Sequence, residues 1–306
     1  MTQEPNGTNG AESAEYQSEA ASELASEQLV LGYPGAEQPV IDGESITAEP
    51  GAVTALVGPN GSGKSTLLKG LANQLAPEDG SVLIDGEEVT RMGDKEFAKR
   101  LGLLSQESTS PDSIRVEQLV YHGRYPHRGF FESVTEQDRE HVDRAIDLAG
   151  CDHLRDREVG SLSGGQKQLA WIAMVLAQDT DVLLLDEPTT FLDLHHQLEV
   201  MEIIETLRET GEVTIVVVLH DIQQAARLAD RVVALKDGQI QANGKPGEVV
   251  TEELLADVFE IEARVEQTDR GPRVEPLRPR HDRPDEHSHE PSGPESACET
   301  VELTSD

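Results

Sequence analysis

The sequence predicts an α/β protein: a mixed, mainly parallel sheet flanked by helices, with an antiparallel β subdomain and an inserted α-helical subdomain. Three observations predict this fold. The apolar run 53–57 is followed at once by the glycine-rich segment 58–66, which is typical of a phosphate-binding loop between a buried strand and a helix. The apolar run 182–185 ends in two acids, as expected of a parallel strand that is covered on both faces. Between them, residues 107–167 carry helical patterns without strong strand runs.

The first part of the chain, 28 to about 106, is expected to alternate short strands and turns over the ligand. A helix over 65–74 should follow the glycine-rich loop, and a strand is expected at 81–84, before the turn signal Asp85-Gly86. These elements predict a mixed sheet above the bound ligand.

The helical subdomain is expected over about 107–167, with a helix at 136–149 whose apolar positions recur on one face. The chain then returns to the buried sheet. The later elements that we expect are strands at 181–186 and 214–219, a hairpin at Asp237-Gly238 within 231–267, and a helix at 252–259.

Both ends of the chain are expected to be disordered. Residues 1–27 are rich in Glu, Ser, Ala and Asn and contain no Lys or Arg, so a helix over 11–27 is not expected to persist. Pro, Arg, Glu, Ser and His dominate 268–306. The folded domain is therefore expected at 28–267.

Three histidines in the second of these tails, His281, His287 and His289, invite a divalent-metal site, because imidazoles beside acids bind such ions. A flexible, proline-rich segment offers no preorganised geometry, however. A solvated tail is therefore the favoured interpretation.

The glycine-rich segment matches the phosphate-loop pattern G-x-x-x-x-G-K-[ST] at Gly58, Gly63, Lys64 and Ser65. Glycines let the backbone curl so that successive N–H groups face phosphate oxygens, and the following helix adds its positive end. Lys64 supplies a charge to the outer phosphates, and the Ser65 hydroxyl is expected on Mg²⁺. The predicted loop ligands are Gly58, Pro59, Asn60, Gly61, Ser62, Gly63, Lys64, Ser65 and Thr66.

The two acids that follow the second apolar run are Asp186 and Glu187. Asp186 is expected to hold Mg²⁺, and Glu187 is expected to polarise the water that attacks the γ-phosphate. Adjacent acids are common in so acidic a chain. Their position at the end of a buried strand favours the functional interpretation.

Residues 162–166 read Leu-Ser-Gly-Gly-Gln and precede a helical stretch at 167–177. With this segment the chain resembles the ATP-binding-cassette (ABC) ATPases, whose core is a P-loop NTPase fold. In that family the segment is the signature motif, which contacts the γ-phosphate of ATP held by a partner subunit. The resemblance implies a homodimer, with ATP and Mg²⁺ as cofactors. The signature residues that it implies for ATP are Ser163, Gly164, Gly165 and Gln166.

The other markers of that family follow in the expected order. Gln106 matches the glutamine that reaches the metal and the attacking water and marks where the transport partner docks. Asp193 matches the loop that crosses the dimer interface, and His220 matches the switch histidine on the γ-phosphate. Tyr33 resembles the aromatic that stacks on adenine, although an ordinary surface tyrosine is the alternative.

Three stretches, 122–129, 170–174 and 188–194, resemble the ATPase subunits of iron(III)-siderophore importers, whose relatives handle cobalamin and haem. The similarity spans about 28–267. It implies integral membrane permease subunits, an extracellular substrate-binding protein that acts through the permease, and a peripheral position on the cytoplasmic face of the membrane. Gln106 and 122–128 are expected to pass motion to the permease.

Two other classes remain open. Soluble cassette proteins of translation and DNA repair usually carry two cassettes or a long coiled-coil insertion, and this chain shows neither between Ser65 and Ser163. A regulatory nucleotide switch that never transports is the other. Co-purification of membrane subunits distinguishes both from an importer.

Composition is consistent with this setting. The 306 residues include 36% hydrophobic ones, enough for a real core, but no apolar run approaches the roughly 20 residues of a membrane span. No signal peptide is expected. The two cysteines, Cys151 and Cys298, have no metal-ligand spacing, so the chain reads as cytosolic and free of disulfides.

The net charge of −34 comes from 59 acids against 25 bases, of which seven are lysine. We interpret this as a salt-adapted surface of a halophile. The tails hold 16 acids and 5 bases, which leaves 43 acids and 20 bases in 28–267, so the acidic excess lies mostly in the folded part. Such a surface argues against nonspecific nucleic-acid binding, which depends on Lys and Arg.

Overall fold

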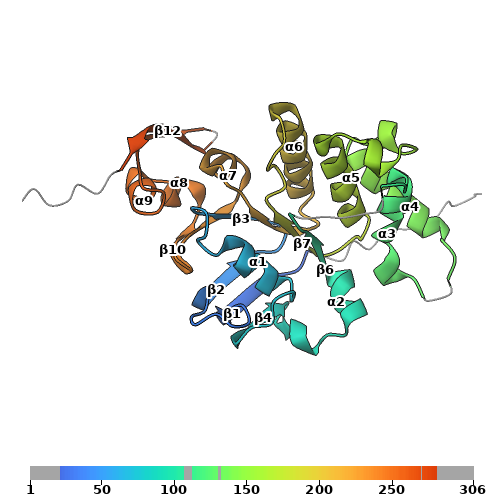
Figure 1. Cartoon of the computed structure of the whole chain (residues 1–306), viewed down its shortest axis with the longest axis horizontal. Helices are drawn as coiled ribbons and strands as arrows, with labels where there is room; N and C mark the ends of the chain where they lie inside the picture. Colours follow the sequence, from blue (N-terminus) through green and yellow to red (C-terminus); the bar gives the residue numbers. More distant parts are fainter. Residues whose placement is uncertain (1–20, 107–111, 130–131, 270, 281–306) are drawn as a thin grey trace, which may run out of the picture.

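The computed structural model describes residues 21–106, 112–129, 132–269 and 271–280 (Figure 1). Its centre is a six-stranded sheet in which five strands are parallel and the edge strand β10 (Gln239–Gly244) is antiparallel to its neighbour β9 (Arg231–Lys236). In their order across the sheet, the strands are β10, β9, β3 (Val53–Val57), β8 (Thr214–Val218), β7 (Val182–Asp186) and β6 (Leu101–Leu104).

A second, antiparallel sheet lies below the first in Figure 1, with the helix α1 (Lys64–Leu71) between the two. The strands of this sheet, in order, are β2 (Ile41–Ala48), β1 (Leu24–Leu31), β4 (Asp79–Ile84) and β5 (Glu87–Glu88).

The other helices lie around these sheets, and a two-stranded hairpin follows them. The helices are α2 (Asp94–Arg100), α3 (Val116–His122), α4 (Glu136–Leu148), α5 (Gly164–Leu176), α6 (Leu194–Thr210), α7 (Ile222–Leu228), α8 (Pro246–Val249) and α9 (Glu252–Asp257). Short 3₁₀ turns occupy Val89–Arg91, Tyr125–His127, Asp152–Leu154 and Val159–Ser161. The hairpin strands are β11 (Ile261–Thr268) and β12 (Gly271–Pro279). None of the described helices combines the length and the hydropathy that crossing a bilayer requires.

The six-stranded sheet is buried on both faces, which explains its continuous apolar runs. Side chains alternate between the faces along each strand. In β7, Leu183 and Leu185 pack into the core beneath α3 to α7, whereas Val182 and Leu184 pack toward α1 and the antiparallel sheet. The α/β fold class predicted from the sequence, with its mixed sheet, antiparallel part and helical part, is thus confirmed.

The helices α3, α4 and α5 form a layer that is held together by a buried ion pair. Arg124 Nε lies 3.1 Å from Asp138 Oδ1, and both side chains are at most 5% exposed. Arg124 Nη1 also donates to the carbonyl oxygen of Ala177 at 2.9 Å. One guanidinium therefore ties the start of α4 to the end of α5.

The predicted tail boundaries at 27 and 268 are wrong. Strand β1 already begins at Leu24, which pairs with Ala48 on one side and Ile84 on the other. At the other end, β12 extends to Pro279 and pairs with β11. Composition concealed both segments because β1 begins among Glu and Ser residues, and because β12 is stabilised by backbone pairing with few apolar side chains. Residues 1–20 and 281–306, with the three tail histidines, lie outside the described part.

Candidate nucleotide-binding and hydrolysis site

The loop between β3 and α1 requires glycine at specific positions. A Cβ on Gly58 would lie 2.1 Å from the carbonyl oxygen of Leu235, so no side chain fits there. Gly63, the N-cap of α1, has φ 99, and a Cβ on it would lie 2.7 Å from Cδ1 of Ile41. Gly61 has φ 81, and a Cβ on it would meet nothing within 4 Å. The backbone of this loop is therefore curled and open toward one side, as phosphate binding demands.

Lys64 is 4% exposed and folds back over the loop. Its Nζ donates to the carbonyl oxygens of Gly58 at 3.0 Å and Pro59 at 2.9 Å. Burial lowers the pKa of Lys64, while the charges of Glu187 and Asp186 act in the opposite direction. The ammonium is thus held beside the loop amides and the two acids, where it can bind a phosphate oxygen.

Ser65 and Asp186 form an oxygen pair suited to Mg²⁺. The Ser65 hydroxyl donates to Asp186 Oδ1 at 3.0 Å, although the two residues are 121 apart in the sequence. Burial raises the pKa of Asp186, the Ser65 hydrogen bond opposes this effect, and the nearby Glu187 charge adds to it. Mg²⁺ prefers a few protein oxygens together with substrate phosphates and water. Among the described residues, no group of three or more His, Cys, Asp or Glu could hold a metal ion by itself.

Glu187 is the point where the predicted catalytic residues meet. Its Oε1 lies 2.5 Å from His220 Nε2, and its Oε2 accepts from Gln106 Nε2 at 2.9 Å. Its backbone has φ 51, in the left-handed region that non-glycine residues rarely adopt. Residues from the ends of three strands, β6, β7 and β8, therefore converge on one carboxylate.

Thr190 is a contact of Glu187 that the sequence analysis did not single out. Its hydroxyl donates to Glu187 Oε2 at 3.2 Å, so the carboxylate is fixed from within its own turn. A hydroxyl three residues after an acid is a common turn arrangement, which is the one signal that could have indicated it.

Tyr33 lies close to the loop helix. Its hydroxyl is 3.3 Å from the Thr66 hydroxyl, and the residue is 42% exposed. The ring is thus anchored next to the predicted phosphate site while part of it remains open to solvent. This arrangement suits an aromatic that stacks on a base.

The signature segment begins α5 with a capping box. The Ser163 hydroxyl accepts from the backbone N–H of Gln166 at 3.3 Å, and Gln166 Oε1 accepts from the Ser163 N–H at 3.2 Å. A Cβ on Gly165 would lie 2.2 Å from the ring of His196. Gly164 faces open space.

His196 connects the signature to Asp193. The sequence did not indicate this residue. Asp193 Oδ1 accepts from the His196 backbone N–H at 3.0 Å and lies 2.9 Å from its Nδ1. These hydrogen bonds hold the pKa of the Asp193 carboxyl below its usual value. The histidine ring therefore fixes the N-terminus of α6 against that of α5.

The signature and the phosphate loop are separated within the chain. In Figure 1, α5 lies above the six-stranded sheet and α1 lies below it, and each packs into the core of its own face. Within the described residues, no hydrogen bond or ion pair joins 163–166 to 58–66. The chain therefore presents the two predicted ATP contacts as separate surfaces.

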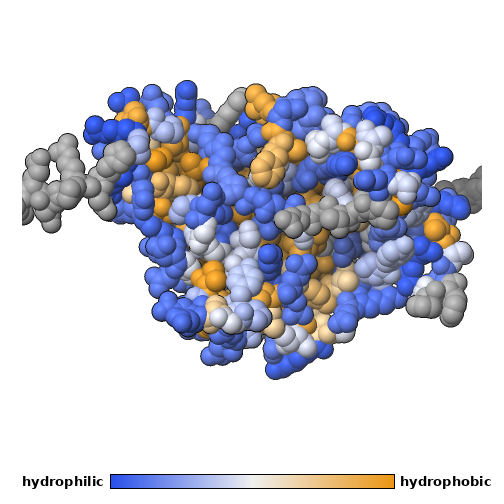
Figure 2. Space-filling view, viewed as in Figure 1, coloured by the Kyte–Doolittle hydropathy of each residue, from blue (hydrophilic) through white to orange (hydrophobic). Residues whose placement is uncertain are grey.

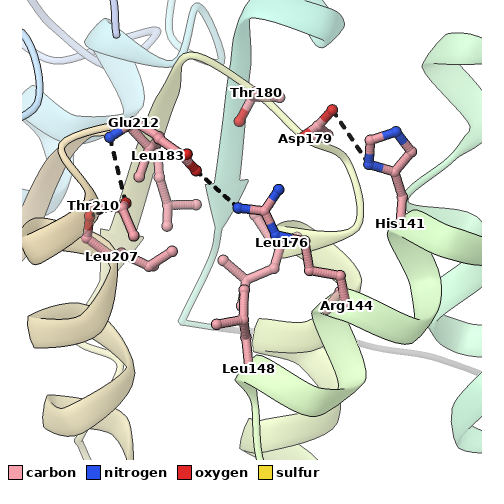
Figure 3. Close-up of a pocket in the computed structure, with 13 residues that line it drawn as sticks. His141, Arg144, Leu148, Leu176, Asp179, Thr180, Leu183, Leu207, Thr210 and Glu212 are labelled. Carbon is pink, nitrogen blue, oxygen red and sulfur yellow. Dashed lines mark hydrogen bonds and ion pairs between the residues drawn. The ribbon is translucent and has the colours of Figure 1, made fainter. Parts of the chain in front are cut away.

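A separate pocket, partly open to solvent, lies between the helical layer and the sheet (Figure 3). Arg144 and Glu212 approach to 2.8 Å on one side, and His141 lies 3.4 Å from Asp179 on the other. Its apolar lining includes Leu148, Leu176, Leu183 and Leu207. None of the predicted site residues lines it, so it is distinct from the nucleotide site.

Comparison with known proteins agrees with this geometry. The family model described as ABC transporter matches residues 41–190. The ferric enterobactin transport ATP-binding protein of Escherichia coli K12 is 44% identical over 81% of this chain and 90% of its own length. A petrobactin import ATP-binding protein of Bacillus anthracis is 45% identical over 79% of this chain and 88% of its own length. A solved metal-chelate type ABC transporter in an inward-facing conformation is similar, with a TM-score of 0.71 at 28% identity, covering 84% of this chain and 98% of the other.

Proposed function

The chain belongs to the ATP-binding subunits of ABC transporters, and from this premise we propose that its ATP hydrolysis drives the import of iron(III)-siderophore complexes through separate membrane subunits. The observation that carries the hydrolytic part is the convergence of His220 and Gln106 on Glu187, next to the Ser65 and Asp186 pair. A base, its orienting groups and a metal-binding pair thus occupy one edge of the sheet.

ATP binding is assigned first to the loop. The amides of 58–66 and the Lys64 ammonium bind the phosphates, and Tyr33 stacks on the adenine. Mg²⁺, when bound, neutralises charge on the outer phosphates, and Ser65 and Asp186, with Gln106, are the residues that would hold it.

Hydrolysis is assigned to Glu187, which accepts a proton from the attacking water. Gln106 and His220 hold the carboxylate in place through its two oxygens, and both are assigned to contact the γ-phosphate or the attacking water. The Thr190 hydroxyl also donates to this carboxylate and fixes its orientation.

Closure of a homodimer completes the site. Ser163, with the glycines and Gln166 that follow it, contacts the γ-phosphate held by a second copy, and Asp193 lies across the interface. Support comes from the exposed apolar residues beside Asp193: Phe191 is 95% exposed, Leu194 71% and Leu198 51%. Figure 2 shows apolar residues gathered over the position of α6, on a face that is otherwise mostly hydrophilic.

Loss of the γ-phosphate removes the contacts that favour the closed dimer. A ligand shifts a conformational equilibrium only by its differential affinity for the two states. ATP binds both halves of the closed site, whereas ADP lacks the shared group. Hydrolysis therefore reopens the dimer, and this motion is available to drive a partner.

The permease contact is assigned to Gln106 and the stretch 122–128. Within that stretch the side chains divide: Arg124 is 3% exposed, whereas Tyr125 is 59% exposed and stacks on His122 with ring centroids 4.9 Å apart. The exposed Tyr125 ring, stacked on the half-buried His122, is thus available to a permease loop, while Arg124 is buried in its ion pair with Asp138. This contact puts the protein at the cytoplasmic face of the membrane.

Glu187→Gln tests the hydrolytic assignment. The amide keeps the size of the side chain but cannot accept a proton, so turnover should fall at least about 100-fold while ATP binding remains. Steady-state phosphate release and equilibrium ATP binding measure the two quantities. Near-normal turnover would refute the assignment of the base.

The transport assignment is tested by purification from a native membrane extract at high salt, with mass spectrometry of what accompanies the protein. A polytopic permease with an extracellular siderophore-binding protein supports the importer, and uptake of radiolabelled iron(III)-siderophore by the reconstituted complex identifies the cargo. Uptake of cobalamin or haem in its place would correct the cargo alone. A soluble complex with intact ATPase activity would refute transport.

A further inference from the structure

The first turn of α7 carries two adjacent glutamines that bind different parts of the molecule. Gln223 Nε2 donates to the carbonyl oxygen of Pro272 at 3.1 Å, and its Oε1 accepts from the Val274 N–H at 2.8 Å. The carbonyl of one strand residue and the N–H of the second residue after it face the same edge. One side-chain amide therefore fills the place of a neighbouring strand on the edge of β12 that β11 leaves unpaired.

The hairpin also touches the other end of α7. Gly271 has φ 95, and a Cβ on it would lie 2.8 Å from the carbonyl oxygen of Ala226. The adjacent Pro272 is buried. The backbone of the hairpin is therefore fitted against the helix at both of its turns.

Gln224 points instead to the loop that carries Glu187. Its Oε1 accepts from the Thr189 hydroxyl at 3.2 Å, and its Nε2 donates to Gln197 Oε1 at 3.3 Å. Gln197 in turn donates to the carbonyl oxygen of Leu192 at 3.1 Å. Thr189, only two residues after Glu187, is 8% exposed, so its hydroxyl depends on a protein partner.

The same helix begins next to the switch histidine. Asp221 caps α7 by accepting from the Gln223 N–H at 2.8 Å, and His220 precedes it directly. A displacement of this one turn therefore moves three things together: the edge of the hairpin, the 187–193 loop and the His220 ring on Glu187.

We propose that Gln223 and Gln224 are positioning residues through which the C-terminal hairpin β11–β12 sets the rate of ATP hydrolysis at Glu187. This inference rests on the proposed function of Glu187. Gln223 fixes α7 to the hairpin. Gln224 fixes the same helix to the 187–193 loop through its hydrogen bond with Thr189, so the position of the hairpin determines that of the loop. The hydrogen bonds of the two side chains go to residues without an assigned role in ATP binding, so their effect is on the geometry of the hydrolytic step and not on ATP binding.

The test compares Gln223→Ala and Gln224→Ala in the full-length chain by steady-state ATP hydrolysis. We expect kcat to fall about tenfold in each, because small displacements of catalytic groups have large effects on rate, while KM for ATP stays unchanged. The double variant should fall by much less than the product of the two, because both residues act through one helix.

Matched variants separate positioning from general damage. Gln224→Glu keeps the acceptor for the Thr189 hydroxyl and should recover part of kcat, whereas Thr189→Val should reproduce the loss. Gln267→Ala removes a different hydrogen bond of the hairpin, to the carbonyl oxygen of Gly247 at 3.4 Å, and should retain the wild-type kcat. All assays are run below the thermal transition of each variant.

Wild-type kcat in both alanine variants, fully multiplicative effects, or an equal loss in Gln267→Ala would overturn the inference. Glu187→Gln is assayed in the same series. If that variant keeps normal turnover, the proposed function fails; if it is inactive while the glutamine variants are unaffected, only the role of the hairpin fails.

Discussion

The phosphate loop and the signature segment differ in how far the chain itself completes them. At the loop, Lys64 is buried and bonded to two carbonyls, and Ser65 is bonded to Asp186. At the signature, the Ser163 and Gln166 side chains each accept from the other's backbone N–H, and Gly164 faces open space. The loop is thus ready to bind ATP within one chain, whereas the signature has a fixed shape without its ligand. In the proposed function, this difference means that one copy suffices for ATP binding, whereas hydrolysis needs two.

Removal of salt should have the largest effect, because it should unfold the phosphate loop and the signature segment together. We propose that the acidic surface is adapted to molar salt, where the Debye length of about 3 Å limits repulsion between neighbouring carboxylates. Transfer from molar KCl to dilute buffer should therefore unfold the protein, a change of more than about 5 kcal/mol. Circular dichroism and ATPase activity measure it. Full activity and an unchanged spectrum in dilute buffer would contradict salt adaptation.

Arg124→Met removes the buried ion pair that ties α4 to the C-terminal end of α5, the helix that the signature begins. It leaves Asp138 buried without its partner, so the free energy of unfolding should fall by about 3–5 kcal/mol. Arg139→Ala is the control, since the exposed pair of Arg139 with Glu136 contributes less than about 0.5 kcal/mol. Denaturant unfolding in high salt compares the two, and equal losses would show that burial of the first pair does not matter.

Lys64→Met should weaken the binding of ATP by the phosphate loop. Charge-assisted hydrogen bonds to phosphate are lost, and the Kd for ATP should rise about 100-fold, or about 2.8 kcal/mol. Lys95→Met, on the exposed helix α2, is the matched control and should bind ATP normally. Calorimetric titration measures both. Unchanged affinity in Lys64→Met would remove Lys64 from the binding site.

Ser163→Ala should have the smallest effect, and it separates ATP binding by one chain from hydrolysis by two. ATP affinity of the single chain should stay the same, whereas turnover should fall about tenfold, because the hydroxyl acts only on ATP held by a second copy. The variant also loses an N-cap, so Thr251→Ala, which loses the equivalent cap of α9, is the control for stability. A fall in ATP affinity of the single chain would contradict the separation of the two surfaces.

The parts of the fold that the sequence predicted are those with local signals. The strands β7 and β8 are unbroken apolar runs, and the loop before α1 is fixed by glycines, so both were recognisable. The hairpin strand β12 was not, because its order depends on backbone pairing with β11 and on the Gln223 amide, which lies about fifty residues away. Contacts of that kind leave no periodic pattern.

The candidate site divides in the same way. Gln106 and His220 were predicted from the resemblance to the ABC ATPases, and Asp186 and Glu187 from their position after a buried strand. The structure brings these residues together because β6, β7 and β8 are neighbouring parallel strands that end at one edge of the sheet. The contact of His196 with Gly165 and that of Gln224 with Thr189 could not be predicted, since each joins elements that are distant in sequence.

The most direct test of the account is the mass in solution of Glu187→Gln with and without ATP and Mg²⁺, measured by analytical ultracentrifugation in molar KCl. We expect the 33.3 kDa chain without ATP and a species of twice that mass with ATP, and we expect that Ser163→Ala added to the same variant prevents the change. A chain that binds ATP fully yet keeps its single mass would contradict the claim that two copies share the site.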